Sequence, residues 1–318
     1  MTAVLAGETL FGRPGIRGAV RREELVLHYQ PIVELRSRRP VAAEALLRWR
    51  LPDGLVAPGA FWQDTDASCA REIGQFVLET ACRQVAAWRA DGLCGEVSVN
   101  TDPRELSPGW VASVYDALAR HDLPPSALNV ELTETSRIDP VTGSEVAAAL
   151  IRHGVGVALD DAGTGFNALA AVNELPLTEL KIDRSFVSHL GDGRADALVR
   201  GLVAISAELG MRTVAEGVET EQQAQILERY GVHRAQGYLF SRPVAPAGLA
   251  EYWRANAQDA AALKLIREMA AVGASPATIA ALLNRRGVEG PNGRSWRPAS
   301  VSRAMLADPS GIPAARRA

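Results

Sequence analysis

The chain has 318 residues, which is enough for one large domain and a small appended module. Hydrophobic residues make up 47% of it and the formal net charge is −3, values that exclude a disordered chain. No apolar run is long enough to span a bilayer, so we expect no membrane contact. The three cysteines form no CxxC pair, which argues against a zinc or disulfide framework and favours the reducing cytoplasm.

Charge is unevenly distributed along the chain. Residues 281–318 hold seven arginines against two acidic residues, whereas the rest of the chain is acidic. An acidic body with a basic tail suggests modules with different partners. We therefore expect an N-terminal extension over residues 1–22, a main domain over residues 23–256, and a helical module with a basic tail over residues 257–318.

In chain order, short apolar segments alternate with helical patterns between residues 25 and 245. Strands are predicted over residues 26–33, 41–49, 97–100, 129–132, 155–160, 179–182, 211–215 and 235–240. Within residues 73–88 and 195–209, apolar residues recur every three or four positions, as in a helix with one buried face. The first two strands adjoin without a helix, which predicts an antiparallel pair. The remaining strand–helix repeats predict an α/β fold, a TIM-like (β/α)8 barrel with one antiparallel strand.

The predicted strands carry polar residues, mostly at or just after their C-terminal ends. They are Glu44, Asn100, Glu131, Glu134, Asp160, Asp161, Lys181, Asp183, Glu216 and Gln236. A barrel gathers the C-terminal ends of its strands on one face, where catalytic groups sit. Any one of them alone could be a surface or capping residue, but their recurrence on consecutive strands predicts a site.

The pair Asp160-Asp161 follows an apolar, β-branched run and precedes a glycine-rich segment. Two adjacent carboxylates repel each other, so their place at the mouth of a core strand favours a compensating cation. Mg²⁺ and Mn²⁺ prefer carboxylate oxygens. The alternative is a solvated turn after an ordinary strand.

The polar cluster lacks the thiols and grouped histidines of a zinc site, and the chain has no GxSxG or GxxxxGK[ST] motif. One or two Mg²⁺ or Mn²⁺ ions in such a cluster would activate water for hydrolysis of a phosphate ester. Lys181 could orient that water, or act as a base if burial lowered its pKa.

The polar residues stand in motifs spread over residues 25–245. The motifs are Tyr29-Gln30-Pro31-Ile32, Glu44-Ala45-Leu46-Leu47-Arg48-Trp49, Val97-Ser98-Val99-Asn100, Glu131-Leu132-Thr133-Glu134, Asp160-Asp161, Lys181-Ile182-Asp183-Arg184-Ser185-Phe186, Ala215-Glu216-Gly217-Val218-Glu219 and Gln236-Gly237-Tyr238. Together they resemble the EAL-domain phosphodiesterases of bacterial cyclic di-GMP signalling. The resemblance implies a TIM-like barrel with one reversed strand that linearises cyclic di-GMP to pGpG using Mg²⁺ or Mn²⁺, and a homodimer formed through the barrel.

The resemblance also implies roles for individual residues. Metal binding falls to Glu44, Asn100, Glu131, Asp160 and Asp161. Catalysis falls to Lys181, Glu44 and Glu216, and substrate binding to Gln30, Leu46, Arg48 and Gln236, with Arg48 on a phosphate. Glu134 and Glu219 would support the loop that follows Asp160-Asp161.

Two segments depart from the family pattern without removing a metal ligand. Ala162 stands where the family has Phe, and the loss of a buried ring typically costs about 3–5 kcal/mol of packing if nothing compensates. Residues 61–66 read Phe-Trp-Gln-Asp-Thr-Asp, where the family usually has Phe-Ile-Pro-x-Ala-Glu. These departures leave open a second hypothesis, a receptor that binds cyclic di-GMP with little or no hydrolysis.

Residues 257–318 predict helices. A helix is expected over residues 261–272, a second between the N-cap Ser275 and Gly287, and a third from Pro298, with Trp296 as a core anchor. The pattern resembles a helical segment in the DNA-binding part of serine recombinases, which implies DNA contact through residues 275–306. The alternative is a helical cap on the barrel with solvated arginines.

Overall fold

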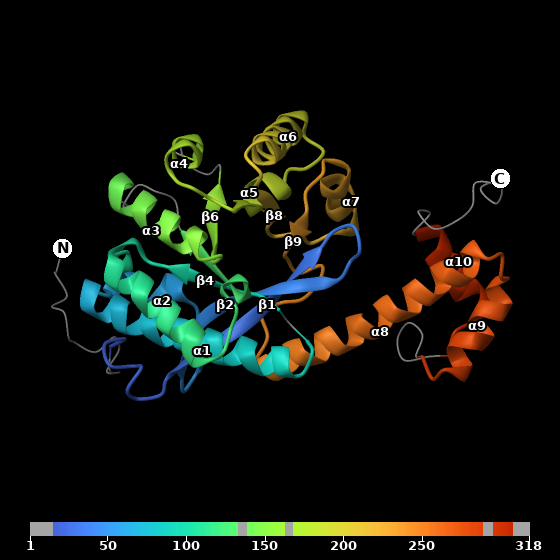
Figure 1. Ribbon diagram of the computed structural model, residues 1–318, viewed down its shortest axis with the longest axis horizontal. Helices are drawn as coiled ribbons and strands as arrows, with labels where there is room; N and C mark the ends of the chain where they lie inside the picture. Colours follow the sequence, from blue (N-terminus) through green and yellow to red (C-terminus); the bar gives the residue numbers. More distant parts are fainter. Residues whose placement is uncertain (1–14, 94, 133–138, 163–167, 289–294, 308–318) are drawn as a thin grey trace. The chain divides into compact units, whose positions relative to one another are not determined.

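The computed structural model describes residues 15–93, 95–132, 139–162, 168–288 and 295–307. The chain forms two compact units, Met1–Leu249 and Ala250–Ala318, and the boundary between them falls inside helix α8 (Pro246–Ala271). Figure 1 shows the elements along the chain. None of the helices in the described part of the chain combines the length and apolar character needed to cross a bilayer.

The first unit contains a closed barrel. Its strands are β1 (Leu25–Glu34), β2 (Pro40–Leu51), β4 (Val97–Thr101), β5 (Leu128–Leu132), β6 (Gly156–Ala162), β7 (Glu179–Ile182), β8 (Arg212–Ala215) and β9 (Arg234–Ala235). The order β1-β9-β8-β7-β6-β5-β4-β2 closes through pairing of β1 with β2. β1 runs antiparallel to both neighbours and the other barrel pairs are parallel, which confirms the predicted architecture.

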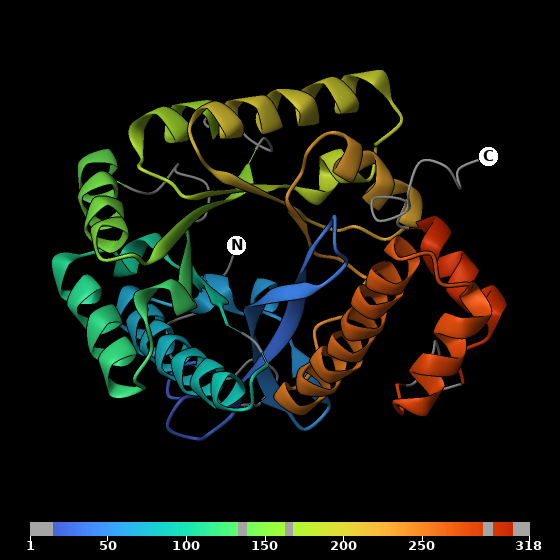
Figure 2. The same cartoon turned by 45° about the vertical axis from the view of Figure 1, so that its right-hand side comes forward.

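Helices surround these strands, as Figure 2 shows. They are α1 (Ala67–Ala90), α2 (Pro108–Arg120), α3 (Pro140–Arg152), α4 (Ala168–Glu174), α5 (Arg184–Val187), α6 (Gly193–Glu208) and α7 (Glu221–Arg229). The predicted helices over residues 73–88 and 195–209 correspond to α1 and α6. The side chain of Asp66 caps α1 by accepting a hydrogen bond from the Cys69 amide, which satisfies one of the free N–H groups at the helix start.

The strand predicted over residues 235–240 is wrong in extent, because β9 ends at Ala235. The chain turns at Gly237, where a Cβ atom would lie only 2.1 Å from the Val218 carbonyl oxygen. Gly237 therefore lets the backbone approach Val218 closely, and the Val218 amide donates to the Gln236 carbonyl at 3.0 Å. A three-residue strand absent from the prediction, β3 (Gly54–Val56), pairs with β2 outside the barrel.

Strand β6 extends past its predicted end at Asp160. The pairing register with β7 shifts between Leu159 and Ala162, and Asp161 has a positive φ of 54°. This irregularity is a β-bulge, after which Ala162 pairs with Ile182. The two adjacent aspartates thus lie within the bulge, where the local kink changes the directions of their side chains.

The second unit is helical and comprises the end of α8, α9 (Pro276–Arg285) and α10 (Pro298–Ala307). The helix predicted over residues 261–272 is part of the longer α8. The helices of this second unit share a buried core that contains Ala262, Ile266, Ala270, Ile279, Ala280, Leu283, Trp296 and Val301. Asn284 fixes the start of α10 by donating to the Trp296 carbonyl at 2.9 Å and accepting from the Trp296 amide at 2.8 Å.

Candidate active site

A cavity of about 650 Å³ opens at the C-terminal face of the barrel, a size typical of small-molecule sites. Its lining includes Gln30, Glu44, Leu46, Asp160, Lys181, Glu216, Glu219 and Gln236, all of them predicted site residues. The strands bring these residues together because their inward-facing side chains meet at the barrel mouth.

Lys181 on β7 lies among four carboxylates. Its Nζ is 2.6 Å from Glu131 Oε2, 2.6 Å from Glu216 Oε1 and 2.9 Å from Asp160 Oδ1. Glu44 Oε2 lies 3.8 Å away. The Lys181 side chain is only 1% exposed, so these interactions are weakly screened by solvent. Lys181 therefore partly offsets the mutual repulsion of the acids.

Burial shifts the ionisation of this cluster. It raises the pKa of Glu131 well above its ordinary value, and the pKa of Glu216 to about 8. It also raises the pKa of Asp161 to about 6. Burial alone lowers the pKa of Lys181, but the surrounding carboxylates outweigh it and hold that pKa above its usual value. The four carboxylates thus favour the ammonium form of Lys181.

Side-chain amides orient Glu44 on β2. Gln236 Nε2 donates to Glu44 Oε2 at 2.6 Å and to Gln30 Oε1 at 2.8 Å. Asn100 Nδ2 donates to Glu44 Oε1 at 2.7 Å. Both oxygens of Glu44 therefore accept a hydrogen bond, and an amide oxygen such as that of Asn100 is a ligand type that suits a hard cation.

The donor atoms fit a divalent cation. Asp160, Asp161 and Glu216 each offer an oxygen, and these oxygens all lie within 4.8 Å of one another. Glu131 Oε1 is buried and accepts no hydrogen bond from the part of the chain that the structure describes. An orphaned carboxylate oxygen beside three converging acids suits a hard cation such as Mg²⁺ or Mn²⁺, which binds oxygen ligands.

Some predicted residues lie beside the cavity or outside the described part of the chain. Asn100, Glu131 and Asp161 join the site through the contacts above rather than through the cavity lining. Arg48 is half-buried, and its Nη1 donates to the neighbouring Leu47 carbonyl at 2.7 Å. Glu134 lies outside the described residues, as do residues 163–167 of the loop that it was predicted to support.

The cavity lining also includes residues for which the sequence predicted no role. These are Arg184, Ser185, Ser188, His189, Gly217, Gln223, Gly237 and Tyr238. Tyr238 is 52% exposed, and the Arg242 guanidinium lies 4.1 Å from the centre of its ring. Several of them lie in the sequence motifs quoted above, a signal that could have identified them as cavity residues. Ser188, His189 and Gln223 had none, because their position depends on how α5 and α7 pack.

Both segments that depart from the family pattern are integrated into the fold. Ala162 is fully buried, so its side chain faces the protein interior and not solvent. In the segment 61–66, Trp62 Nε1 donates to Asp102 Oδ2 at 2.8 Å. That bond ties the segment to the residues that follow β4.

Comparison with known proteins identifies a family and its relatives. The family model described as "EAL domain" matches residues 15–243. MucR of Pseudomonas aeruginosa, a bifunctional diguanylate cyclase/cyclic di-GMP phosphodiesterase, is 40% identical over 235 residues, covering 72% of this chain and 34% of MucR. A cyclic di-GMP phosphodiesterase of the same organism is 34% identical, covering 72% of this chain and 40% of that protein. The chain thus matches about a third to two fifths of the length of these relatives.

Solved structures agree with this relationship. The PaMucR phosphodiesterase in complex with c-di-GMP is 39% identical, with a TM-score of 0.69 over 74% of this chain and 97% of that one. The EAL domain of Mycobacterium smegmatis DcpA is 35% identical, with a TM-score of 0.63 over 74% and 97%.

Proposed function

This chain belongs to the EAL domain family, and on that premise we propose that it is a metal-dependent phosphodiesterase that hydrolyses cyclic di-GMP to linear pGpG. The observation that carries the proposal is Lys181, buried among four carboxylates at the edge of a 650 Å³ cavity. Clusters with strongly shifted pKa values inside a cavity are typical of catalytic sites. The proposed location is the cytoplasm.

One or two Mg²⁺ or Mn²⁺ ions are part of this proposal. Their ligands would be Glu44, Asn100, Glu131, Asp160 and Asp161. When bound, such ions supply an activated water and stabilise the charge that develops on the phosphate oxygens.

The chain's own groups would complete the reaction. The Lys181 ammonium would donate a hydrogen bond that orients the attacking water. Bound cations would lower the pKa of Glu216 from about 8, so that its carboxylate could ionise and accept the proton of that water. Substrate binding would fall to Gln30, Leu46, Arg48 and Gln236, with the Arg48 guanidinium on a phosphate. Glu134 and Glu219 would support the loop that follows Asp160-Asp161.

The competing hypothesis is a receptor that binds cyclic di-GMP without turning it over. Calorimetric titration of the nucleotide in the presence of Ca²⁺ or Mn²⁺, followed by product analysis of the same Mn²⁺ sample, separates the two. Binding with pGpG formation supports the enzyme, and binding without product in Mn²⁺ or Mg²⁺ supports the receptor.

A second function is proposed for the C-terminal unit, contact with DNA through residues 275–306. The supporting observation is a compact pair of helices, α9 and α10, joined through the Asn284–Trp296 clamp, with exposed Arg285, Arg286 and Arg297. Such pairs place one helix in the major groove and arginines on phosphates. The alternative remains a helical module whose arginines are merely solvated.

A homodimer formed through the barrel is also proposed. Leu198 within α6 and Leu209 just after it are 47% and 56% exposed, so these apolar side chains could take part in a contact between two copies. Two copies would present two DNA-contacting modules to two half-sites. Sedimentation equilibrium of the full chain against Leu198→Asp tests this proposal, because a monomeric wild type would contradict it.

A further inference from the structure

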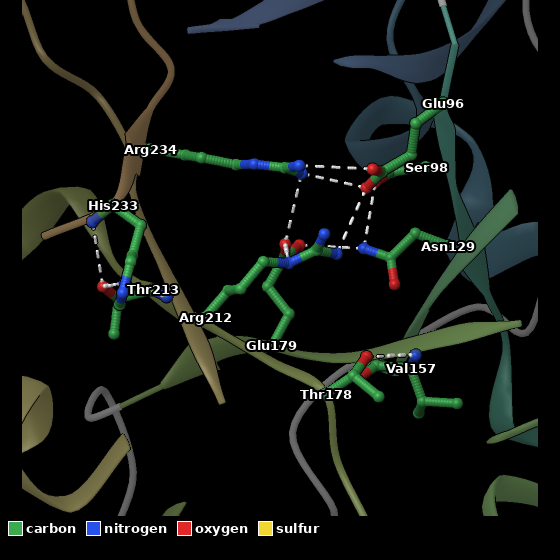
Figure 3. Close-up of polar contacts among 10 residues, drawn as sticks. All are labelled: Glu96, Ser98, Asn129, Val157, Thr178, Glu179, Arg212, Thr213, His233 and Arg234. Atoms are coloured by element: carbon green, nitrogen blue, oxygen red, sulfur yellow. Dashed lines mark hydrogen bonds and ion pairs between the residues drawn. The ribbon is translucent and has the colours of Figure 1, made fainter. Parts of the chain in front are cut away.

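A second polar layer, drawn in Figure 3, lies inside the barrel one step along the strands from the candidate active site. It contains Ser98 on β4, Asn129 on β5 and Glu179 on β7. Each residue stands two positions before a residue of the site on the same strand, namely Asn100, Glu131 and Lys181. Because strand side chains alternate in direction, residues two apart share one face. The lower layer therefore faces the barrel interior directly below the site.

Asn129 links the three strands of this layer. Its Nδ2 donates to Glu179 Oε1 at 2.8 Å and to Ser98 Oγ at 3.2 Å. These three residues are at most 1% exposed. Strand β6, which separates β5 from β7, contributes Gly156, where a Cβ atom would lie 2.4 Å from Asn129 Oδ1. The space that Asn129 occupies thus depends on a glycine in the intervening strand.

Glu179 is also held from its other side. Its Oε2 lies 3.2 Å from Arg212 Nε and 3.6 Å from Arg234 Nη1. Both arginines in turn pair with Glu96 Oε1, at 3.3 Å and 2.9 Å. The acceptor of the Asn129 amide is therefore fixed by charged groups from β8, β9 and the residue before β4, and Figure 3 shows this arrangement.

We propose that Asn129 is a positioning residue for the candidate active site. By joining β4, β5 and β7 one layer down, it sets the relative heights of Asn100, Glu131 and Lys181, so that their polar atoms converge. The inference rests on the proposed function. Supporting contacts around metal ligands typically change metal affinity or activity 10- to 100-fold when they are removed.

The test is Asn129→Ala in the full chain. Calorimetry measures Mn²⁺ affinity, and steady-state kinetics with cyclic di-GMP gives kcat and KM. We expect Mn²⁺ affinity and kcat to fall about 10- to 100-fold. KM should change much less, because Gln30 and Leu46 lie on β1 and β2, whereas the side-chain hydrogen bonds of Asn129 go to β4 and β7.

Thr213→Val is the matched control. Thr213 is fully buried on β8, and within the described residues its side-chain hydrogen bonds go to His233, at 2.9 Å from Oγ1 to Nδ1, and not to Ser98, Asn129 or Glu179. This variant should lose stability but keep Mn²⁺ affinity and kcat. An equal loss of affinity in Thr213→Val, or unchanged affinity in folded Asn129→Ala, would overturn the inference.

Ser98→Ala is the milder variant should Asn129→Ala fail to fold. It removes the 3.2 Å bond and keeps the bond from Asn129 to Glu179. We expect a smaller loss of Mn²⁺ affinity in the same direction, and no loss would count against the inference. A wild-type chain that neither binds Mn²⁺ nor forms pGpG would refute both the proposed function and this inference. An active wild type whose Asn129→Ala and Ser98→Ala variants keep full Mn²⁺ affinity and kcat would refute the inference alone.

Discussion

Lys181 Nζ lies 2.6 Å from Glu131 Oε2, and the two side chains are 1% and 0% exposed. We predict that Lys181→Met lowers kcat by about 10²- to 10⁴-fold, since it removes the donor that orients the water. Mn²⁺ affinity should be retained or increased, because the variant removes a competing cation and no ligand. Kinetics and calorimetry on the same preparation measure both.

The chain offers a matched control for this prediction. Its second lysine, Lys264, is exposed on α8, so Lys264→Met should change neither kcat nor Mn²⁺ affinity. Near-normal turnover by Lys181→Met would show that the ammonium has no part in the reaction.

A second prediction concerns Ala162, which is fully buried and paired with Ile182. Ala162→Phe restores the family residue but inserts a ring at a buried position, and overpacking of a core typically costs about 1–3 kcal/mol. We expect a lower melting temperature and no gain in turnover. The exposed Ala119→Phe on α2 should leave the melting temperature nearly unchanged. A more stable and faster Ala162→Phe would show that the missing ring limits this chain.

A third prediction concerns Glu105, whose carboxyl packs so closely on α1 that a Cβ at Gly74 would lie 1.7 Å from Oε2. Burial raises the pKa of Glu105 to about 8 from an ordinary 4.5. The folded state therefore keeps this proton where the unfolded state has lost it. The resulting stability is fully present below about pH 4.5 and is lost as the pH rises towards about 8.

Glu105→Gln removes this pH dependence. As the pH rises from 5 to 8, the free energy of unfolding of the variant should increase relative to that of the wild type by up to about 1.4 kcal/mol per pH unit. Above pH 8 the difference between the two should stay constant. Urea titrations from pH 5 to 9 measure the difference, with the exposed Glu208→Gln as control. A difference that is constant over this range would contradict the assignment.

Much of the fold was predictable because its signals are local. The predicted strand over residues 179–182 matches β7 residue for residue, and the antiparallel β1–β2 pair followed from two adjoining apolar segments. The bulge at Asp161 was not predictable, because it depends on pairing with β7. The early end of β9 likewise depends on the approach of Gly237 to Val218, two residues from different elements.

The candidate site divides in the same way. Acids at strand ends are visible in the sequence, and the structure brings the described ones together. Asn129 and Glu179 were not singled out, because each sits in a short apolar segment and their hydrogen bond joins residues 50 positions apart. Buried polar pairs of this kind become visible only once the strands are in register.

A fourth prediction tests the C-terminal unit with a mobility shift at about physiological salt. If α9 and α10 contact DNA, the full chain binds it, and Arg285→Ala or Arg286→Ala weakens binding for all sequences alike. Removing one arginine that binds a phosphate should reduce the slope of log affinity against log salt by about one. The exposed Arg194→Ala on α6 should leave binding unchanged. If the full chain causes no mobility shift, DNA contact is contradicted and the alternative of a helical module with solvated arginines remains.

The most direct test of the central claim is the product formed from cyclic di-GMP. The purified chain is incubated with the nucleotide and Mg²⁺ or Mn²⁺, and the products are separated by liquid chromatography. We predict that either ion supports formation of linear pGpG and that EDTA abolishes it. Glu44→Ala should form no product, because it removes the carboxylate that Asn100 and Gln236 orient. Cyclic di-GMP that is bound by the wild type but recovered intact would contradict the claim and identify the chain as a receptor.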